Sequence, residues 1–223
     1  MARPGKDQPG RPLRRDAERN RKRILAAAAE VFASRGLQAT LDDVAHQAGV
    51  GVGTVYRRFP DKESLVEALF EPRAQSLVTL AEQALQAPDS WIGLVAMLER
   101  AAALLARDRG LREILLFATY GHDRVELARS RMQQAVTKVV ERAQRDGKLR
   151  ADLQGTDIPF IEFMLASAAE YAGVVRPEIW RRYLALIIDG LRPSRDGASA
   201  LSADALTAEE MVISMHPVRQ HRR

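Results

Sequence analysis

The chain has 223 residues, which suits one domain or two small ones, and 46% of them are hydrophobic. It contains no cysteine, which excludes disulfides, thiolate zinc sites and cysteine nucleophiles. The net charge of +5 lies at one end, because residues 1–63 carry 13 Lys and Arg against 8 Asp and Glu, whereas residues 64–223 carry 21 of each. A positive end on a neutral body suits a polyanion such as nucleic acid, and a basic tail that only aids solubility is the alternative.

The composition also bears on fold class and location. Ala, Leu, Glu and Arg are strong helix formers and are abundant, and no run of alternating β-branched residues is present. We therefore predict an all-α protein. No apolar stretch is long enough to span a membrane, and no hydrophobic segment follows the charged N-terminus as a secretory signal requires. We expect a soluble, cytoplasmic protein without a membrane partner.

The first elements in chain order are an arm and a helix. Residues 1–13 contain three prolines and two glycines, which predicts a disordered basic arm. A helix is expected from about Asp16 to Arg35, and Gly36 stands where a left-handed C-terminal cap belongs. The apolar face of this helix, at helical spacing, consists of Ile24, Leu25, Ala28, Val31 and Phe32.

Residues 40–65 are predicted to form two short helices joined by a glycine turn. Thr40 and Asp43 have the spacing of a capping box, so the first helix begins there and stops at Gly49. The second helix covers roughly Val52 to Phe59. Such a pair is not stable alone and needs the preceding helix beneath it.

Longer helices follow. Asp61 is placed to cap one that starts at Lys62. Residues 193–223 lack strong periodicity, so a mostly disordered tail is expected, with at most a helical turn near Ala208 to Ile213. Between these regions, amphipathic helices are expected over Ser90–Ala106, Leu111–Tyr120, Val125–Asp146, Thr156–Val175 and Glu178–Leu191.

The two short helices have the form of a helix-turn-helix, in which the second helix enters the major groove and the first crosses the DNA backbone. Small residues at the start of the second helix allow close approach, and its free N–H groups can bind phosphate. Arginine is the usual reader of guanine, and a tyrosine hydroxyl or a lysine can hold a phosphate. The candidate DNA-binding residues are Gly51, Val52, Gly53, Thr54, Tyr56, Arg57 and Lys62.

Residues 14–70 closely resemble the DNA-binding domain of the TetR family of transcriptional regulators. The resemblance covers about a quarter of the chain, and the matching elements occur in the family's order. They are Ile24-Leu25-x-Ala-Ala, Phe32-Ala33-x-x-Gly36, Thr40-x-x-Asp43-Val44-Ala45-x-x-Ala48-Gly49-Val50, Gly53-Thr54-Val55-Tyr56-x-x-Phe59 and Lys62-Glu63-x-Leu65.

The resemblance implies roles for individual residues. Thr40, Thr54, Tyr56 and Lys62 occupy positions that usually touch the phosphate backbone, and Arg57 occupies one that contacts a base or the backbone.

One departure concerns the start of the recognition helix, where many members have a Ser-Lys pair and this chain has Gly51-Val52. Val52 can contact a thymine methyl group instead. Backbone or minor-groove charge can come from the preceding basic segment, through Arg14, Arg15, Arg19 and Arg23.

The resemblance further implies an all-helical homodimer, a small-molecule pocket in the C-terminal body, and repression that the ligand relieves. The last two helices would pair with their copies in a four-helix interface, and a two-fold dimer requires a roughly palindromic double-stranded DNA operator. The expected division is a disordered arm at 1–13, a helix-turn-helix DNA-binding domain at 14–62, a helical ligand-binding and dimerisation domain at 63–192, and a tail at 193–223.

Methionine and aromatic side chains on several helices suit an adaptable apolar pocket, although an ordinary core explains each of them as well. With the resemblance, they predict a site for an unknown small hydrophobic or amphipathic ligand. Glu162 and Glu170 could orient a cationic ligand if they are buried, and a solvated helix face is the simpler interpretation. The candidate ligand-binding residues are Met97, Phe117, Tyr120, Phe163 and Tyr171.

Three alternatives stay open: a DNA-binding regulator without an effector, a nonspecific architectural DNA-binding protein, and a helical enzyme. No Gly-x-Ser-x-Gly elbow or paired-acid motif supports catalysis. The glycine run at 49–54 lacks the Gly-Lys-Ser/Thr ending of a phosphate loop, and the four histidines lack metal-ligand spacing. We therefore expect a non-enzymatic regulator without metal or cofactor.

Overall fold

The computed structural model describes residues 11–116, 123–173, 175–193 and 207–210. Within these ranges the chain is helical and contains no strand, which confirms the all-α prediction. The elements are α1 (Arg11–Arg35), η1 (Gly36–Gln38), α2 (Leu41–Ala48), α3 (Val52–Arg58), α4 (Lys62–Gln86), α5 (Ser90–Arg107), α6 (Arg109–Leu116), α7 (Asp123–Arg145), η2 (Gly155–Asp157), α8 (Ile158–Ala172) and α9 (Ile179–Leu191).

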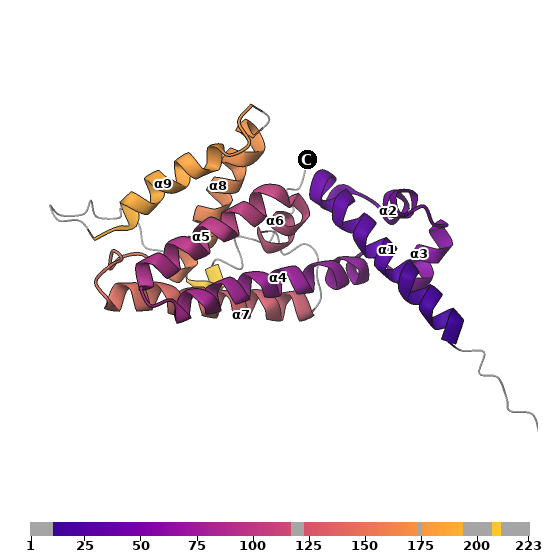
Figure 1. The fold of residues 1–223 in the computed structure, drawn as a ribbon, viewed down its shortest axis with the longest axis horizontal. Helices are drawn as coiled ribbons and strands as arrows, with labels where there is room; N and C mark the ends of the chain where they lie inside the picture. The colour runs from indigo at the N-terminus through magenta and orange to yellow at the C-terminus, as the bar shows by residue number, and fades with distance from the viewer. Residues whose placement is uncertain (1–10, 117–122, 174, 194–206, 211–223) are drawn as a thin grey trace, which may run out of the picture.

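Figure 1 shows α1, α2 and α3 at one end of the molecule, with α4 running from them into a larger helical body. The small end has its own apolar core, to which the first turns of α4 and the short helix α6 also contribute. Its fully buried side chains include Ile24, Phe32, Val44, Val55 and Leu65. Burial of this shared face holds the short helices α2 and α3 in place, since helices of this length are not stable alone.

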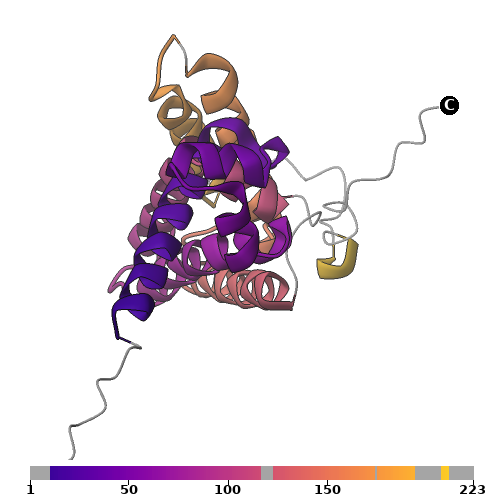
Figure 2. The same cartoon turned by 90° about the vertical axis from the view of Figure 1, so that its right-hand side faces the viewer.

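A second core lies in the body, between α4, α5, α7, α8 and α9. Helices α4 and α7 lie side by side in both views (Figures 1 and 2). Side chains from the body helices that meet in this core include Leu94, Leu98, Val139, Leu165 and Trp180. The long helix α4 contributes to both cores and therefore joins the two parts of the molecule.

Several helix ends differ from the predicted ones. Helix α1 begins at Arg11 rather than near Asp16, and α8 ends at Ala172 rather than Val175. Helix α6 begins earlier than expected because the Asp108 carboxylate accepts a hydrogen bond from the Leu111 backbone N–H at 3.0 Å.

Parts of the predicted arm, of the Leu111–Tyr120 helix and of the tail lie outside the described residues, at 1–10, 117–122, 194–206 and 211–223. Residues 208–210 are helical and fall within the predicted helical turn. Among the described helices, none combines the length and hydropathy that a membrane crossing requires.

Candidate functional site

The first helix of the helix-turn-helix, α2, is fixed by its N-terminal cap. The Thr40 hydroxyl accepts a hydrogen bond from the Asp43 N–H at 3.1 Å, and an Asp43 carboxylate oxygen accepts from the Thr40 N–H at 2.8 Å. This reciprocal pair confirms the predicted capping box. The hydrogen bonds from Thr40, together with one from Arg35, lower the pKa of the Asp43 carboxyl to about 2.

The turn between α2 and α3 depends on Gly49, which ends α2 with a φ of 61°. Glycine reaches this left-handed conformation without the steric cost that a Cβ atom imposes. An Arg23 guanidinium nitrogen donates to the Ala48 carbonyl at 2.8 Å and ties the end of α2 to α1. Arg23, predicted as a source of charge for DNA, thus has a structural contact in the protein.

The recognition helix α3 turns one face inward and the other to solvent. Val55 and Phe59 are 0% and 4% exposed, as predicted for core positions. The opposite face is exposed and begins with small residues, and a Cβ atom built on Gly53 would meet no atom within 4 Å. Tyr56 is 47% exposed, and the neighbouring Arg57 is also exposed. This face can therefore approach a groove closely and still present a hydroxyl and a positive charge.

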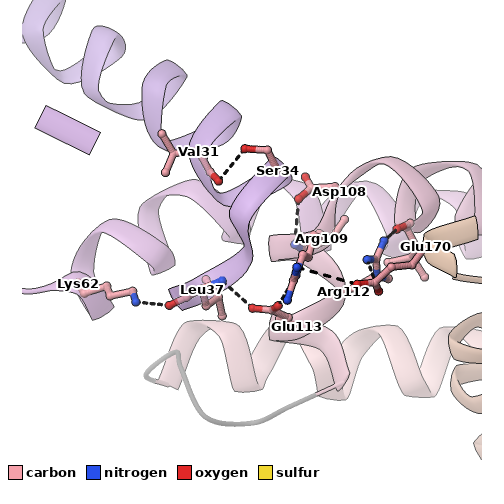
Figure 3. Close-up of polar contacts among 11 residues, drawn as sticks. Val31, Ser34, Leu37, Lys62, Asp108, Arg109, Arg112, Glu113 and Glu170 are labelled. Atoms are coloured by element: carbon pink, nitrogen blue, oxygen red, sulfur yellow. Dashed lines mark hydrogen bonds and ion pairs between the residues drawn. The ribbon is translucent and has the colours of Figure 1, made fainter. Parts of the chain in front are cut away.

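A polar joint connects the helix-turn-helix to the body (Figure 3). One Glu113 carboxylate oxygen on α6 accepts a hydrogen bond from the Leu37 N–H at 2.6 Å, in the turn that follows α1. The other accepts from the Arg109 guanidinium at 2.8 Å. On the far side of the same turn, the Lys62 ammonium donates to the Leu37 carbonyl. Both backbone groups of Leu37 are thus bound by side chains.

The joint continues along α6 into the body (Figure 3). Arg112 is 7% exposed and donates to the Leu105 carbonyl at 2.7 Å and to the Glu170 carboxylate at 2.9 Å. Glu170 is therefore a partly exposed ion-pair partner of α6, rather than the ligand-binding acid considered from the sequence. The i, i+4 spacing of Arg109 and Glu113 indicates a surface ion pair, but it gives no sign of a contact with a residue 76 positions away.

The body contains a cavity of about 330 Å³, a volume typical of small-molecule sites. Its walls come from α4, α5, α6, α7 and α8, with Ala208 beside them, and are largely apolar. They include Leu77, Met97, Leu105, Leu115, Met132, Val136 and Ile158.

Glu162 on α8 lines this cavity and is 5% exposed. Neither of its carboxylate oxygens has a hydrogen-bond partner within the described part of the chain. Loss of hydration on burial raises the pKa of Glu162 well above its ordinary value. The sequence does carry a signal for this burial, because Glu162 has helical spacing with the buried residues Ile158, Ile161, Leu165 and Ala166.

Two family models match the chain in sequence. Residues 24–69 match the model of bacterial regulatory proteins of the TetR family, and residues 88–193 match an SbtR-like transcriptional regulator C-terminal domain. The transcriptional regulator SrpR of Pseudomonas putida is 33% identical over 145 residues, which span 62% of this chain and 67% of SrpR. The chain belongs to the TetR family. It is a DNA-binding transcriptional regulator with a helix-turn-helix.

Two further relatives of this TetR-family regulator match it, one in sequence and one in both sequence and fold. The uncharacterized regulator TtgW of Pseudomonas putida is 34% identical over 128 residues, or 56% of this chain and 92% of TtgW. A TetR transcriptional regulator from Streptomyces coelicolor, known from its crystal structure, is 32% identical and superposes with a TM-score of 0.54. That superposition covers 78% of this chain and 99% of the Streptomyces protein.

The structure brings together half of the ten predicted DNA-binding residues of this TetR-family chain. Five lie on or just before the exposed face of α3: Gly51, Val52, Gly53, Tyr56 and Arg57. Four of the other five have different surroundings. Thr54 is half-buried, Thr40 is exposed beside its capping contact, and Arg19 forms an exposed ion pair with Asp16. Lys62 is turned toward Leu37, and burial lowers the pKa of its ammonium group. The side chain of Arg15 lies outside the described residues.

The predicted ligand-binding residues are only partly brought together. Met97 lines the cavity, and Phe117 and Tyr120 lie outside the described residues. Phe163 and Tyr171 are 42% and 88% exposed and do not line the cavity, so the structure corrects both predictions. The reason is helix geometry, since at 100° per residue Glu162 faces inward while Phe163 is turned away and Tyr171 lies on the opposite face.

Proposed function

We propose that this regulator is a cytoplasmic, non-enzymatic homodimeric repressor. It occupies a palindromic operator and leaves it when a small hydrophobic or amphipathic molecule enters the body cavity. The observation that carries this proposal is the position of α6, which borders the cavity through Leu115 and holds the helix-turn-helix through Glu113.

The DNA-facing side of the proposal rests on charge and exposure. Tyr56 and Arg57 on α3 are exposed, and Gly53 on the same helix has no neighbouring side chain near the position of a Cβ atom. Ahead of Ile24, the first fully buried side chain described in α1, the helix carries Arg19 and Lys22 as exposed cations. The helix then supplies sequence-independent attraction to phosphates, and α3 supplies contacts to base edges.

The dimer is supported by apolar side chains that α8 and α9 leave uncovered. Contiguous exposed apolar surface marks an interaction site, and a second copy covers such a face symmetrically. The exposed residues are Phe163, Met164, Tyr171, Tyr183 and Leu186. The two corrected ligand-binding candidates, Phe163 and Tyr171, thus fit the dimer surface instead.

Coupling between ligand and DNA runs through α6 in this proposal. Arg129 of α7 lines the cavity and donates to the Ile114 carbonyl, one residue after Glu113. A ligand that moves α6 therefore changes the position of Leu37 and, with it, the spacing of the two recognition helices. The ligand shifts the population only if it binds the DNA-free arrangement more tightly.

A reporter gene placed behind the DNA upstream of the protein's own gene tests repression in cells. We expect lower reporter expression when the wild-type protein is supplied and recovery with Arg57→Ala, whose exposed side chain makes the change neutral for folding. Unchanged or higher expression with the wild-type protein would contradict a repressor.

A further inference from the structure

The acid in the cavity is the most unusual polar group of the body. Glu162 is 5% exposed, and both of its oxygens are buried without a hydrogen-bond partner within the described residues. Burial of a polar group destabilises the folded protein when nothing pairs with that group. Such a group in a largely apolar pocket calls for a partner that the described part of the protein does not supply.

The other charged groups that line the cavity, Glu126 and Arg129, both come from α7. Arg129 donates to the Glu126 carboxylate at 3.2 Å and to the Ile114 carbonyl. No ion pair joins it to Glu162, and burial is the only cause that shifts the pKa of Glu162. The residues that line the cavity from α4, α5 and α6 are apolar. Arg129 is thus a cation at the cavity, but within the described chain it binds Glu126 and the Ile114 carbonyl and does not pair with Glu162.

We propose that Glu162 recognises an amphipathic amine, a molecule with an apolar body of a size that fits the cavity and one protonated nitrogen. This inference rests on the proposed ligand-responsive function and names the class of ligand. The apolar walls take up the body of the ligand, and the ammonium group donates a charge-assisted hydrogen bond to the carboxylate. In a site shielded from water this hydrogen bond is stronger than it would be in solvent.

The number of protons released on binding distinguishes an amine from a neutral ligand. The ligand enters as an ammonium ion, and Glu162 gives up its proton to solvent as the ion pair forms. At pH values below the pKa of Glu162 in the free protein, binding therefore releases close to one proton, and affinity rises up to tenfold per pH unit. A neutral ligand that accepts a hydrogen bond from protonated Glu162 releases no proton.

The experiment uses three probes with one apolar body and different charge: 4-phenylbutylamine, 4-phenylbutanol and 4-phenylbutyrate. Each is titrated calorimetrically into the full-length protein, in phosphate and in Tris, whose different ionisation enthalpies report proton release. The variants are Glu162→Gln, which resembles the protonated acid in shape, and Glu126→Gln as the matched control on the same cavity. Release of operator DNA by each probe is measured separately by anisotropy.

We expect the amine to bind the wild-type protein and Glu126→Gln at least tenfold more tightly than the alcohol, with release of close to one proton. In Glu162→Gln this preference should vanish while the alcohol binds as before. Equal binding of amine and alcohol, tighter binding of the acid, or no binding of the amine would overturn the proposal. If the amine binds as expected but leaves DNA bound, the ligand class stands and the proposed release from the operator fails.

Discussion

At the residue scale, the burial of Glu162 gives the stability of the protein a definite dependence on pH. Because its folded-state pKa is raised, the folded protein keeps this proton at pH values where the unfolded chain has released it. This contribution to stability is complete below the unfolded pKa of about 4.3 and is lost as the pH rises toward the folded-state pKa.

Glu162→Gln removes this titration, so the variant should gain stability relative to the wild type as the pH rises from 5 to 8. We expect the difference in melting temperature to grow by at least about 2 °C, which corresponds to roughly 1 kcal/mol in a protein of this size. Thermal unfolding followed by circular dichroism measures it. The partly exposed Glu126→Gln serves as control, and a Glu162→Gln difference that stays constant across this pH range would speak against a buried, protonated acid.

Residue-level features that depend on a few neighbours in sequence could be predicted well. The cap formed by Thr40 and Asp43 and the left-handed glycine at Gly36 are signalled by residue types close together in sequence, and both were confirmed. The environment of Glu162 was harder to predict from the sequence. An acid on the apolar face of a predicted helix can be buried, can lie in a local solvent channel, or can indicate that the buried face is shifted. Tertiary packing decides between these possibilities.

At the element scale, α6 is the helix whose importance the sequence concealed. Six of its eight residues were predicted to be helical, but its polar partners lie in distant segments, at Leu37 and Glu170. Periodicity gives the face that a helix buries and says nothing of which segment covers it. The order and approximate positions of the helices could be predicted, whereas the joint between the two parts of the molecule could not.

Replacing Glu113 tests that joint. In Glu113→Ala the N–H of Leu37, a residue only 2% exposed, loses its acceptor, whereas Glu113→Gln retains a side-chain oxygen in its place. The penalty for an unsatisfied buried donor is about 1–3 kcal/mol, so amide exchange at Leu37 should accelerate about fivefold or more in the alanine variant. The glutamine variant should stay close to the wild type.

Hydrogen exchange followed by NMR measures this effect, with the Val139 amide in the buried face of α7 as a reference for global unfolding. Exchange at Leu37 that is equally slow in both variants would show that Glu113 does not hold the joint. Equal acceleration at Val139 would mean that the variant loosens the whole protein instead.

At the scale of the whole molecule, the exposed apolar side chains of α8 and α9 predict the dimer. Leu186 on α9 and Ile92 on α5 are similarly exposed, at 60% and 65%, but only Leu186 lies on the proposed interface. Leu186→Asp should convert the dimer to monomers at micromolar concentration, because it places a charge in a desolvated apolar contact. Ile92→Asp should stay dimeric.

Sedimentation velocity distinguishes these states directly. A monomeric wild-type protein would contradict the proposed dimer. Equal behaviour of the two variants would show that the dimer interface lies elsewhere. Loss of the dimer should also weaken operator binding, since two recognition helices then no longer bind as one unit.

The most direct test of the central claim is the anisotropy of labelled DNA titrated with the full-length protein. The labelled fragment comes from the region upstream of the protein's own gene, with a scrambled duplex of the same composition as control, at 50 and 200 mM salt. We expect tight binding of the upstream fragment. Binding should weaken at the higher salt concentration, but the protein should still prefer this fragment over the scrambled duplex. Arg57→Ala should reduce the affinity for the upstream fragment. Absence of binding to either duplex at 50 mM salt would contradict a DNA-binding role for α3, and equal, salt-sensitive binding to both would leave only the nonspecific attraction of the basic N-terminal segment.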